Sequence, residues 1–153
     1  MENKFEYKND ALKLDYQLCF PLYACAREVV RRYKPFLDRL DLTYTQYITM
    51  MVLWEEGSVN VKALGERLFL DSGTLTPLLK KLEAKGFITR LRSKADERNL
   101  IITATPRGVA LREEALSIPD EISKCFPLEP EEARTLYRMM YKLLGRDLPN
   151  QGT

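Results

Sequence analysis

One stretch of the chain, Val61–Thr105, restricts the fold more than any other. Its first half predicts two short helices joined by a tight turn, because apolar residues recur at helical spacing on both sides of the turn. The second helix begins near the capping residues Asp71 and Ser72 and ends at Gly86. Its apolar stripe, at positions i, i+3, i+4 and i+7, consists of Leu75, Leu78, Leu79 and Leu82. Pro77 is tolerated only in the first turn of a helix, which agrees with this start.

The second half of the same stretch predicts an antiparallel hairpin. Two runs rich in β-branched residues, Phe87–Arg92 and Asn99–Thr103, lie on either side of the charged segment Ser93–Arg98. A helix–turn–helix followed by a basic hairpin is the arrangement of a winged helix, whose second helix enters the major groove of DNA while the wing lies along the backbone or the minor groove. An amphipathic helix with exposed lysines is by itself often only a solvated face. It is therefore the order of these elements that favours DNA binding.

The groups that would contact DNA follow from this arrangement. The apolar stripe turns hydroxyls and ammonium groups of the second helix outward, and such groups contact phosphates and base edges. Cations outnumber carboxylates in the wing, as contact with phosphates requires, and Asp96 is expected to orient Arg98 within the hairpin. Lys85 and Arg90 have the same outward, basic character in this interpretation. The predicted DNA-binding residues are Ser72, Thr74, Thr76, Lys80, Lys81, Arg92, Lys94, Asp96 and Arg98.

The composition restricts the remaining chemistry. The chain of 153 residues has a net charge of +2, so its affinity for DNA must come from where the charges lie and not from their total. It contains no histidine, which removes histidine-based acid–base catalysis, the Ser-His-Asp triad and most zinc sites. Its three cysteines form no CxxC pair. We therefore expect a protein that is not an enzyme and that holds no metal and no cofactor.

The sequence also predicts where the protein acts. No apolar run is long enough to span a membrane, and the polar segment Met1–Asp10 lacks the character of a signal peptide. We therefore expect a cytoplasmic protein with no membrane contact. In that compartment a sparse set of cysteines is either a set of inert buried thiols or part of a redox sensor.

A long amphipathic helix is predicted before the winged helix, from Leu14 toward Leu40. Pro21 fits best in a first turn, which places Cys19 at or just before a helix N-terminus. Pro35 should kink this helix or break it locally, because its ring removes a backbone hydrogen bond.

Capping patterns predict the other helices. Thr43 and Gln46 form a capping box that opens a helix ending at Gly57, and Asn60 caps the first helix of the helix–turn–helix. Thr105–Pro106 opens a helix after the wing.

Prolines mark the last part of the chain. Pro119 and the segment Cys125–Pro130 indicate a break, Pro130 opens a last helix that ends before Gly145, and Asp147–Thr153 has the character of a frayed tail.

These elements predict a mainly α-helical fold with a small β-hairpin wing, in one domain over residues 1–153. Residues 43–105 form a winged helix–turn–helix DNA-binding lobe, and residues 14–40 and 106–146 form a helical dimerisation region. The terminal helices carry more apolar surface than one small domain needs. A two-fold homodimer would cover it and would suit a palindromic operator in double-stranded DNA.

Two motifs connect this pattern to a known family. The wing sequence Asp96-Glu97-Arg98, preceded by the helix DSGTLTPLLKKLEAKG, resembles the MarR family of dimeric winged-helix repressors. The segment Gln17-Leu18-Cys19-Phe20 is similar to the reactive-cysteine segment of its organic hydroperoxide resistance branch, the OhrR-type sensors. The resemblance extends from about Leu14 to about Pro119. It implies a homodimer in which the first and last helices of the two subunits interleave.

The resemblance also implies a redox role for Cys19. A helix N-terminus stabilises a thiolate, and attack of that thiolate on an organic hydroperoxide gives a sulfenic acid. Carried over from the family, Tyr33 and Tyr44 donate hydrogen bonds to the sulfur, one or both from the partner subunit, and Tyr23 occupies a third matching position. Without the resemblance, a lone cysteine on an apolar helix is more often an inert core residue.

The two other cysteines are interpreted differently. Cys125 lies in the proline-flanked break before the last helix and is the candidate for a second thiol that captures oxidised Cys19 across the dimer. A low-molecular-weight thiol is the alternative partner. Cys25 is expected to be a buried residue of the first helix.

Two other functions stay open at this point. A regulator of the same fold could be controlled by a small aromatic ligand bound between its lobes, with Cys19 incidental. A thiol peroxidase is the weaker alternative, because no arginine or threonine forms a peroxidatic motif next to Cys19 and the winged helix would have no purpose.

Overall fold

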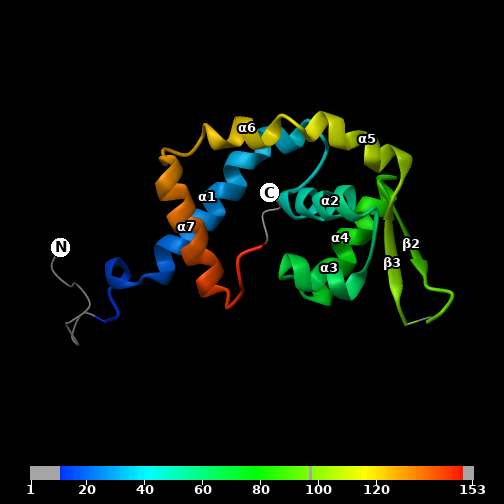
Figure 1. The fold of residues 1–153 in the computed structure, drawn as a ribbon, viewed down its shortest axis with the longest axis horizontal. Coiled ribbons are helices and arrows are strands. Elements are labelled where there is room, and N and C mark those ends of the chain that lie inside the picture. Colours follow the sequence, from blue (N-terminus) through cyan, green and yellow to red (C-terminus); the bar gives the residue numbers. More distant parts are fainter. Residues whose placement is uncertain (1–10, 97, 150–153) are drawn as a thin grey trace. The chain divides into compact units, whose positions relative to one another are not determined.

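The structure, a computed structural model, describes residues 11–96 and 98–149 (Figure 1). The expectations for Met1–Asp10, Glu97 and residues 150–153 lie outside these ranges. Contacts divide the chain into a first unit that extends to Ile118 and a second that begins at Pro119. Each unit is described by itself.

The chain before the winged helix differs from the prediction at its start. Leu14–Tyr16 is a separate 3₁₀ turn, η2, and the long helix α1 spans Cys19–Asp38. Pro21 is the third residue of α1, so it lies in the first turn as predicted, and Cys19 is the first residue. The helix continues through Pro35, so the alternative of a local break there is wrong.

The helix α2, Tyr44–Glu56, begins and ends as its sequence predicts. The Thr43 hydroxyl accepts a hydrogen bond from the Gln46 N–H at 3.3 Å, and the Gln46 side chain accepts one from the Thr43 N–H at 3.1 Å. The chain leaves the helix at Gly57, whose φ of 74° is open to glycine. Because Met50 and Leu53 are buried on its inner side, α2 is the central helix of the first unit.

The helix–turn–helix consists of α3, Val61–Leu68, and α4, Ser72–Ala84. The Asn60 Oδ1 accepts from the Ala63 N–H at 2.8 Å, and the Asp71 Oδ1 accepts from the Thr74 N–H at 2.8 Å, so each helix has its own side-chain cap.

The expectation that Pro77 lies in a first turn is wrong, because Pro77 is the sixth residue of α4. The hydrogen bond that its ring removes is the one to the Gly73 carbonyl, so the defect is confined to the second turn of the helix.

The wing is part of a three-stranded antiparallel sheet in the order β1-β3-β2. The strands β2, Ile88–Arg92, and β3, Leu100–Ala104, form the predicted hairpin, with Ile88 opposite Ala104. The third strand, β1 at Ser58–Asn60, was not predicted. It pairs with β3 and so anchors the base of the wing next to the start of α3.

After the wing, the helix α5 spans Pro106–Ala115, with Thr105 as its cap. It belongs to the first unit, where Leu111 and Ala115 are buried. The helix α6 follows at Ile118–Ser123, and α7 spans Pro130–Leu143 as predicted from Pro130.

One core holds the first unit together. The helices α2, α3 and α4 contact the sheet on one side (Figure 1), and the end of α1 joins them through Leu37, which is 2% exposed. The most deeply buried side chains include Met50, Leu53, Leu64, Leu75, Leu79, Leu82, Ile88 and Ile102. At about 1.5–3 kcal/mol for each fully buried large apolar side chain, this core can fix the position of α4 without help from another chain.

Two other helical segments are apolar but exposed. They are the first half of α1, where Phe20 and Leu22 are 42% and 44% exposed, and α7, which has no buried residue. None of the described helices is both long enough and apolar enough to cross a membrane.

Candidate nucleic-acid interface and redox site

The outward face of α4 carries the side chains that the sequence predicted for DNA contact. Leu75, Leu78, Leu79 and Leu82 are all buried, which leaves the opposite face in solvent. Its exposed members are Ser72, Thr74, Thr76, Lys80 and Lys81. The Thr74 hydroxyl donates to Asp71 Oδ2 at 3.3 Å and that of Thr76 to the Ser72 carbonyl at 2.8 Å. Both hydroxyl oxygens keep acceptor capacity.

Two cations that the sequence interpretation turned outward lie elsewhere. Lys85 donates to the Asp41 carbonyl and lies 3.3 Å from Gln46 Oε1, so it points back to the corner between α1 and α2. Arg90 makes two hydrogen bonds to Glu83 Oε2, at 3.0 and 2.6 Å. This pair ties the base of the wing to the end of α4. The periodicity of one segment could not reveal these partners in other segments.

The turn of the wing is ordered by Asp96. Its Oδ1 accepts from the Arg98 N–H at 3.0 Å, its Oδ2 accepts from the Asn99 side-chain amide at 3.3 Å, and its carbonyl accepts from the Asn99 N–H at 2.9 Å. Asp96 therefore fixes Arg98 through the backbone. The side chains of Arg92, Lys94 and Arg98 are exposed around this turn.

The start of α2 adds residues that the sequence interpretation missed. A pocket of about 260 Å³ lies between the first turn of α2 and the outer face of α4. Its lining includes Thr43, Thr45, Thr74 and Lys81. The capping box at Thr43 was visible in the sequence, but its position beside α4 is a tertiary property.

Cys19 is an exposed first residue of α1, at the helix N-terminus as predicted. Tyr23 lies one turn further along the same helix and is 58% exposed. Its hydroxyl accepts a hydrogen bond from Arg27 at 3.3 Å, and the Arg27 guanidinium lies 5.7 Å from the centre of its ring.

The structure brings Tyr33 and Tyr44 together, with ring centroids 5.0 Å apart, and Tyr47 lies 5.9 Å from Tyr33. Burial raises the pKa of Tyr33 to about 12 and also raises the pKa of Tyr44, so both hydroxyls remain donors at neutral pH.

Cys19 does not meet these tyrosines within one chain. Tyr33 follows Cys19 by 14 residues on α1, which at 1.5 Å per residue corresponds to about 21 Å along the helix.

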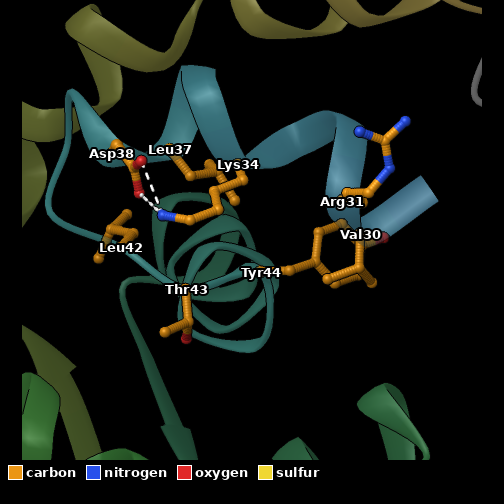
Figure 2. A pocket seen from close by; sticks show the side chains of 8 residues that line it. All are labelled: Val30, Arg31, Lys34, Leu37, Asp38, Leu42, Thr43 and Tyr44. Carbon is orange, nitrogen blue, oxygen red and sulfur yellow. Dashed lines mark hydrogen bonds and ion pairs between the residues drawn. The ribbon is translucent and has the colours of Figure 1, made fainter. Parts of the chain in front are cut away.

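A second pocket adjoins Tyr44 (Figure 2). It has a volume of about 250 Å³ and is lined by Val30, Arg31, Lys34, Leu37, Asp38, Leu42, Thr43 and Tyr44. Figure 2 shows Lys34 directed at Asp38 at one end, where its Nζ lies 2.8 Å from both carboxylate oxygens, and the Tyr44 ring beside Val30 at the other. The pocket thus combines an apolar wall with a charged rim.

The remaining cysteines differ from each other. Cys125 lies between α6 and α7, partly buried, with its sulfur 3.6 Å from the Glu121 carbonyl oxygen. Cys25 is exposed, so the expectation that it is a buried core residue is wrong. It lies in the first half of α1, whereas only the last part of the helix, near Leu37, packs against the core. Among the described residues no group of three cysteine or acidic side chains is placed to hold a metal ion.

Comparison with known proteins agrees with this architecture. Residues 31–114 match the family model described as transcriptional regulator SarA/Rot. The chain is 47% identical over 144 residues to the organic hydroperoxide resistance transcriptional regulator of Bacillus subtilis (strain 168), covering 94% of this chain and 95% of that protein.

Solved structures of AbfR, a protein of Staphylococcus epidermidis, are also similar. Reduced AbfR bound to DNA superposes with a TM-score of 0.75 at 34% identity, covering 91% of this chain and 98% of that one. Disulfide-formed AbfR gives a TM-score of 0.62 at 35% identity, with coverages of 90% and 96%. The winged helix, the length of the match and these identities show that the chain belongs to the SarA/Rot family of MarR-like winged-helix transcriptional regulators.

Proposed function

We propose that this regulator is a cytoplasmic repressor that binds a palindromic operator as a homodimer, senses organic hydroperoxides through Cys19, and leaves the DNA when Cys19 is oxidised. The observation that carries the DNA-binding part is the hydroxyl and lysine face of α4, which a fully buried leucine stripe holds outward. The similarity to a hydroperoxide resistance regulator and to a DNA-bound relative supports the same assignment.

In this proposal α4 lies in the major groove, with Thr74, Thr76, Lys80 and Lys81 toward the DNA. The wing places Arg92, Lys94 and Arg98 along phosphates, on the turn that Asp96 orders. The pocket at the start of α2 would take a backbone phosphate beside Lys81, which adds Thr45 to the contacts. These cations should make the affinity fall with increasing salt.

The dimer completes the redox site. The exposed apolar residues of α1 and α7 need a cover, and a second copy of the same chain supplies one. Because about 21 Å of helix separate Cys19 from Tyr33 in one chain, hydrogen bonds from Tyr33 and Tyr44 to the Cys19 sulfur must come from the partner subunit. Tyr23, one turn from Cys19 on α1, is a tyrosine of the same chain that lies near it.

The chemistry then proceeds in two steps. The Cys19 thiolate attacks the terminal oxygen of the hydroperoxide, so that an S–O bond forms, the O–O bond breaks, and the alkoxide leaves as an alcohol after taking up a proton. The resulting sulfenic acid condenses with a second thiol, forming an S–S bond and releasing water. We assign the second thiol to the partner subunit's Cys125, with a low-molecular-weight thiol as the alternative. One oxidation per signal is expected, without catalytic turnover.

A gel-shift titration tests the proposal, using DNA upstream of the protein's own gene with and without an alkyl hydroperoxide. The wild-type protein should bind when reduced and release after treatment. Cys19→Ser should bind and stay bound, whereas Cys25→Ser, the matched control on the same exposed helix, should respond like the wild type. Release of Cys19→Ser by the hydroperoxide would contradict a sensing role for Cys19.

A non-reducing gel then identifies the second thiol. Treated wild-type protein should form a cross-linked dimer that both Cys19→Ser and Cys125→Ser lose. If Cys125→Ser still leaves the DNA normally and wild type forms no cross-link, a small thiol is the partner.

A second candidate function rests on the pocket of Figure 2. Its apolar wall at Val30 and Tyr44 and its charged rim at Lys34 suit a small aromatic acid. In a regulator of this kind the Cys19→Ser variant would still release DNA when the ligand is added. This result separates ligand control from redox sensing.

A further inference from the structure

Lys85 lies at the point where the recognition helix α4 ends. Its N–H donates to the Lys81 carbonyl at 3.1 Å, and the Phe87 N–H returns to the Leu82 carbonyl at 3.1 Å across Gly86, whose φ is 78°. This is a Schellman-type end, in which the chain reverses direction. The backbone of Lys85 therefore moves with α4.

The side chain of Lys85 reaches a different part of the molecule. Its ammonium group donates to the Asp41 carbonyl, lies 3.3 Å from Asp41 Oδ1, and lies 3.3 Å from Gln46 Oε1. Only 26% of the side chain is exposed. Lys85 thus joins the end of α4 to the corner between α1 and α2. The ammonium group that the sequence interpretation directed outward is bound at this corner.

The corner itself is firmly held. Leu40 and Leu42 are 4% and 5% exposed on either side of Asp41, which has a φ of 53°. The Leu42 N–H donates to the Leu37 carbonyl of α1 at 3.1 Å. Gln46 is 2% exposed, and its Oε1 also accepts from the Thr43 N–H. A bond from Lys85 to this corner is therefore a bond to the fixed end of α1.

We infer that Lys85 is a positioning residue, which holds the recognition helix at the orientation that binds DNA and passes movement of α1 to it. The inference rests on the proposed function, because it takes α4 as the helix in the major groove and Cys19 on α1 as the sensor. Side chains on α4 meet base edges only when the whole helix is correctly inclined. Lys85 acts through Thr76, Lys80 and Lys81 and does not contact DNA itself.

Salt dependence separates positioning from contact. A lysine that neutralises a phosphate contributes about one to the slope of log affinity against log salt. Lys85→Met, which keeps the aliphatic stem and removes the charge, should weaken operator binding between about 2-fold and 30-fold and leave the slope unchanged. Lys81→Met, the matched control four residues earlier on the exposed face, should weaken binding and lower the slope by about one.

Two further measurements complete the test. Lys85→Arg, which can donate to the same oxygens of Asp41 and Gln46, should restore the affinity. The ratio of the operator dissociation constants of oxidised and reduced protein should fall toward one in Lys85→Met, because the polar link from the end of α1 to the end of α4 is lost. If urea unfolding shows that Lys85→Met is poorly folded, Lys85→Gln replaces it, since glutamine keeps a polar side chain and removes the ammonium group.

The outcomes distinguish the role of Lys85 from the role of α4. Wild-type affinity in Lys85→Met, a reduced salt slope, or a wild-type ratio of oxidised to reduced affinity would overturn the inference about Lys85 and leave the proposed function standing. Unchanged affinity and slope in Lys81→Met would overturn the assignment of α4 to the groove, and the inference with it.

Discussion

The helices α4 and α7 have similar hydrophobic patterns, but the apolar face of α4 is buried and that of α7 is exposed. Both are about four turns long and carry an apolar stripe. The stripe of α4 is 0–7% exposed at Leu75, Leu78, Leu79 and Leu82, whereas the stripe of α7 is 37–66% exposed at Leu136, Met139, Met140 and Leu143. The same kind of face is thus buried inside one unit in the first case and left exposed in the second. This difference teaches that an amphipathic pattern predicts that a face will be buried, but does not identify the segment or molecule that covers it.

The largest effect is expected for Leu79→Ala in α4. Removal of a fully buried leucine side chain leaves a cavity in the core and should lower the free energy of unfolding by about 2–5 kcal/mol. Urea unfolding followed by circular dichroism measures it. A loss below about 1 kcal/mol would mean that the stripe of α4 is not packed as described, and the contrast with α7 would disappear.

Leu143→Ala in α7 should act on association instead. Each copy of a dimer loses one apolar side chain worth about 1.5–3 kcal/mol when buried, so the dissociation constant should rise at least about tenfold. Sedimentation velocity over a dilution series measures this constant. Lys142→Ala, the neighbouring control with a polar side chain, should leave it unchanged. Equal effects from both variants, or a wild-type protein that stays monomeric at micromolar concentration, would refute the homodimer.

The smallest effect is a pH dependence at the junction of α1 and α2. Burial raises the pKa of Tyr33 to about 12 in the folded protein, while an unfolded tyrosine titrates near 10. Below pH 10 both states are protonated and the contribution of Tyr33 to stability is fully present. Between pH 10 and about 12 the unfolded chain loses this proton first, so stability falls as the pH rises.

Tyr33→Phe should therefore show a shallower decline than the wild type over this range, measured by urea unfolding at each pH. Tyr23→Phe is the matched control on the exposed half of α1 and should keep the full decline. Identical slopes for the wild type and Tyr33→Phe would place Tyr33 outside the buried part of the molecule.

Much of the fold could be predicted because its signals are local. The caps at Thr43, Asn60 and Asp71 each act within three residues of their partners, so the sequence alone places those helix starts. The leucine stripe of α4 needs only the helical period. The outward face of α4 and the position of Cys19 at the start of α1 follow from these local rules.

The features that were missed depend on residues far apart in the chain. The strand β1 is only three residues long and is defined by its pairing with β3, more than 40 positions later. A side chain at Gly108 would place its Cβ 2.0 Å from the Phe87 carbonyl oxygen, a restriction that no pattern around Gly108 reveals. No local pattern reveals the bonds from Lys85 to Asp41 and from Arg90 to Glu83 either. The prediction for Cys25 was wrong because its half of α1 is exposed, while only the end of the helix near Leu37 packs against the core of the same unit.

The single tryptophan of the chain occupies an informative place. The indole N–H of Trp54 donates to the Gly108 carbonyl at 2.8 Å, and its ring meets Tyr47 edge to face at 6.2 Å, next in line to Tyr33 and Tyr44. Light absorbed by these three tyrosines can therefore pass to one indole that rests on the backbone of α5. The protein carries its own fluorescent reporter of how α1, α2 and α5 are arranged, and its emission can be followed during hydroperoxide treatment without any label.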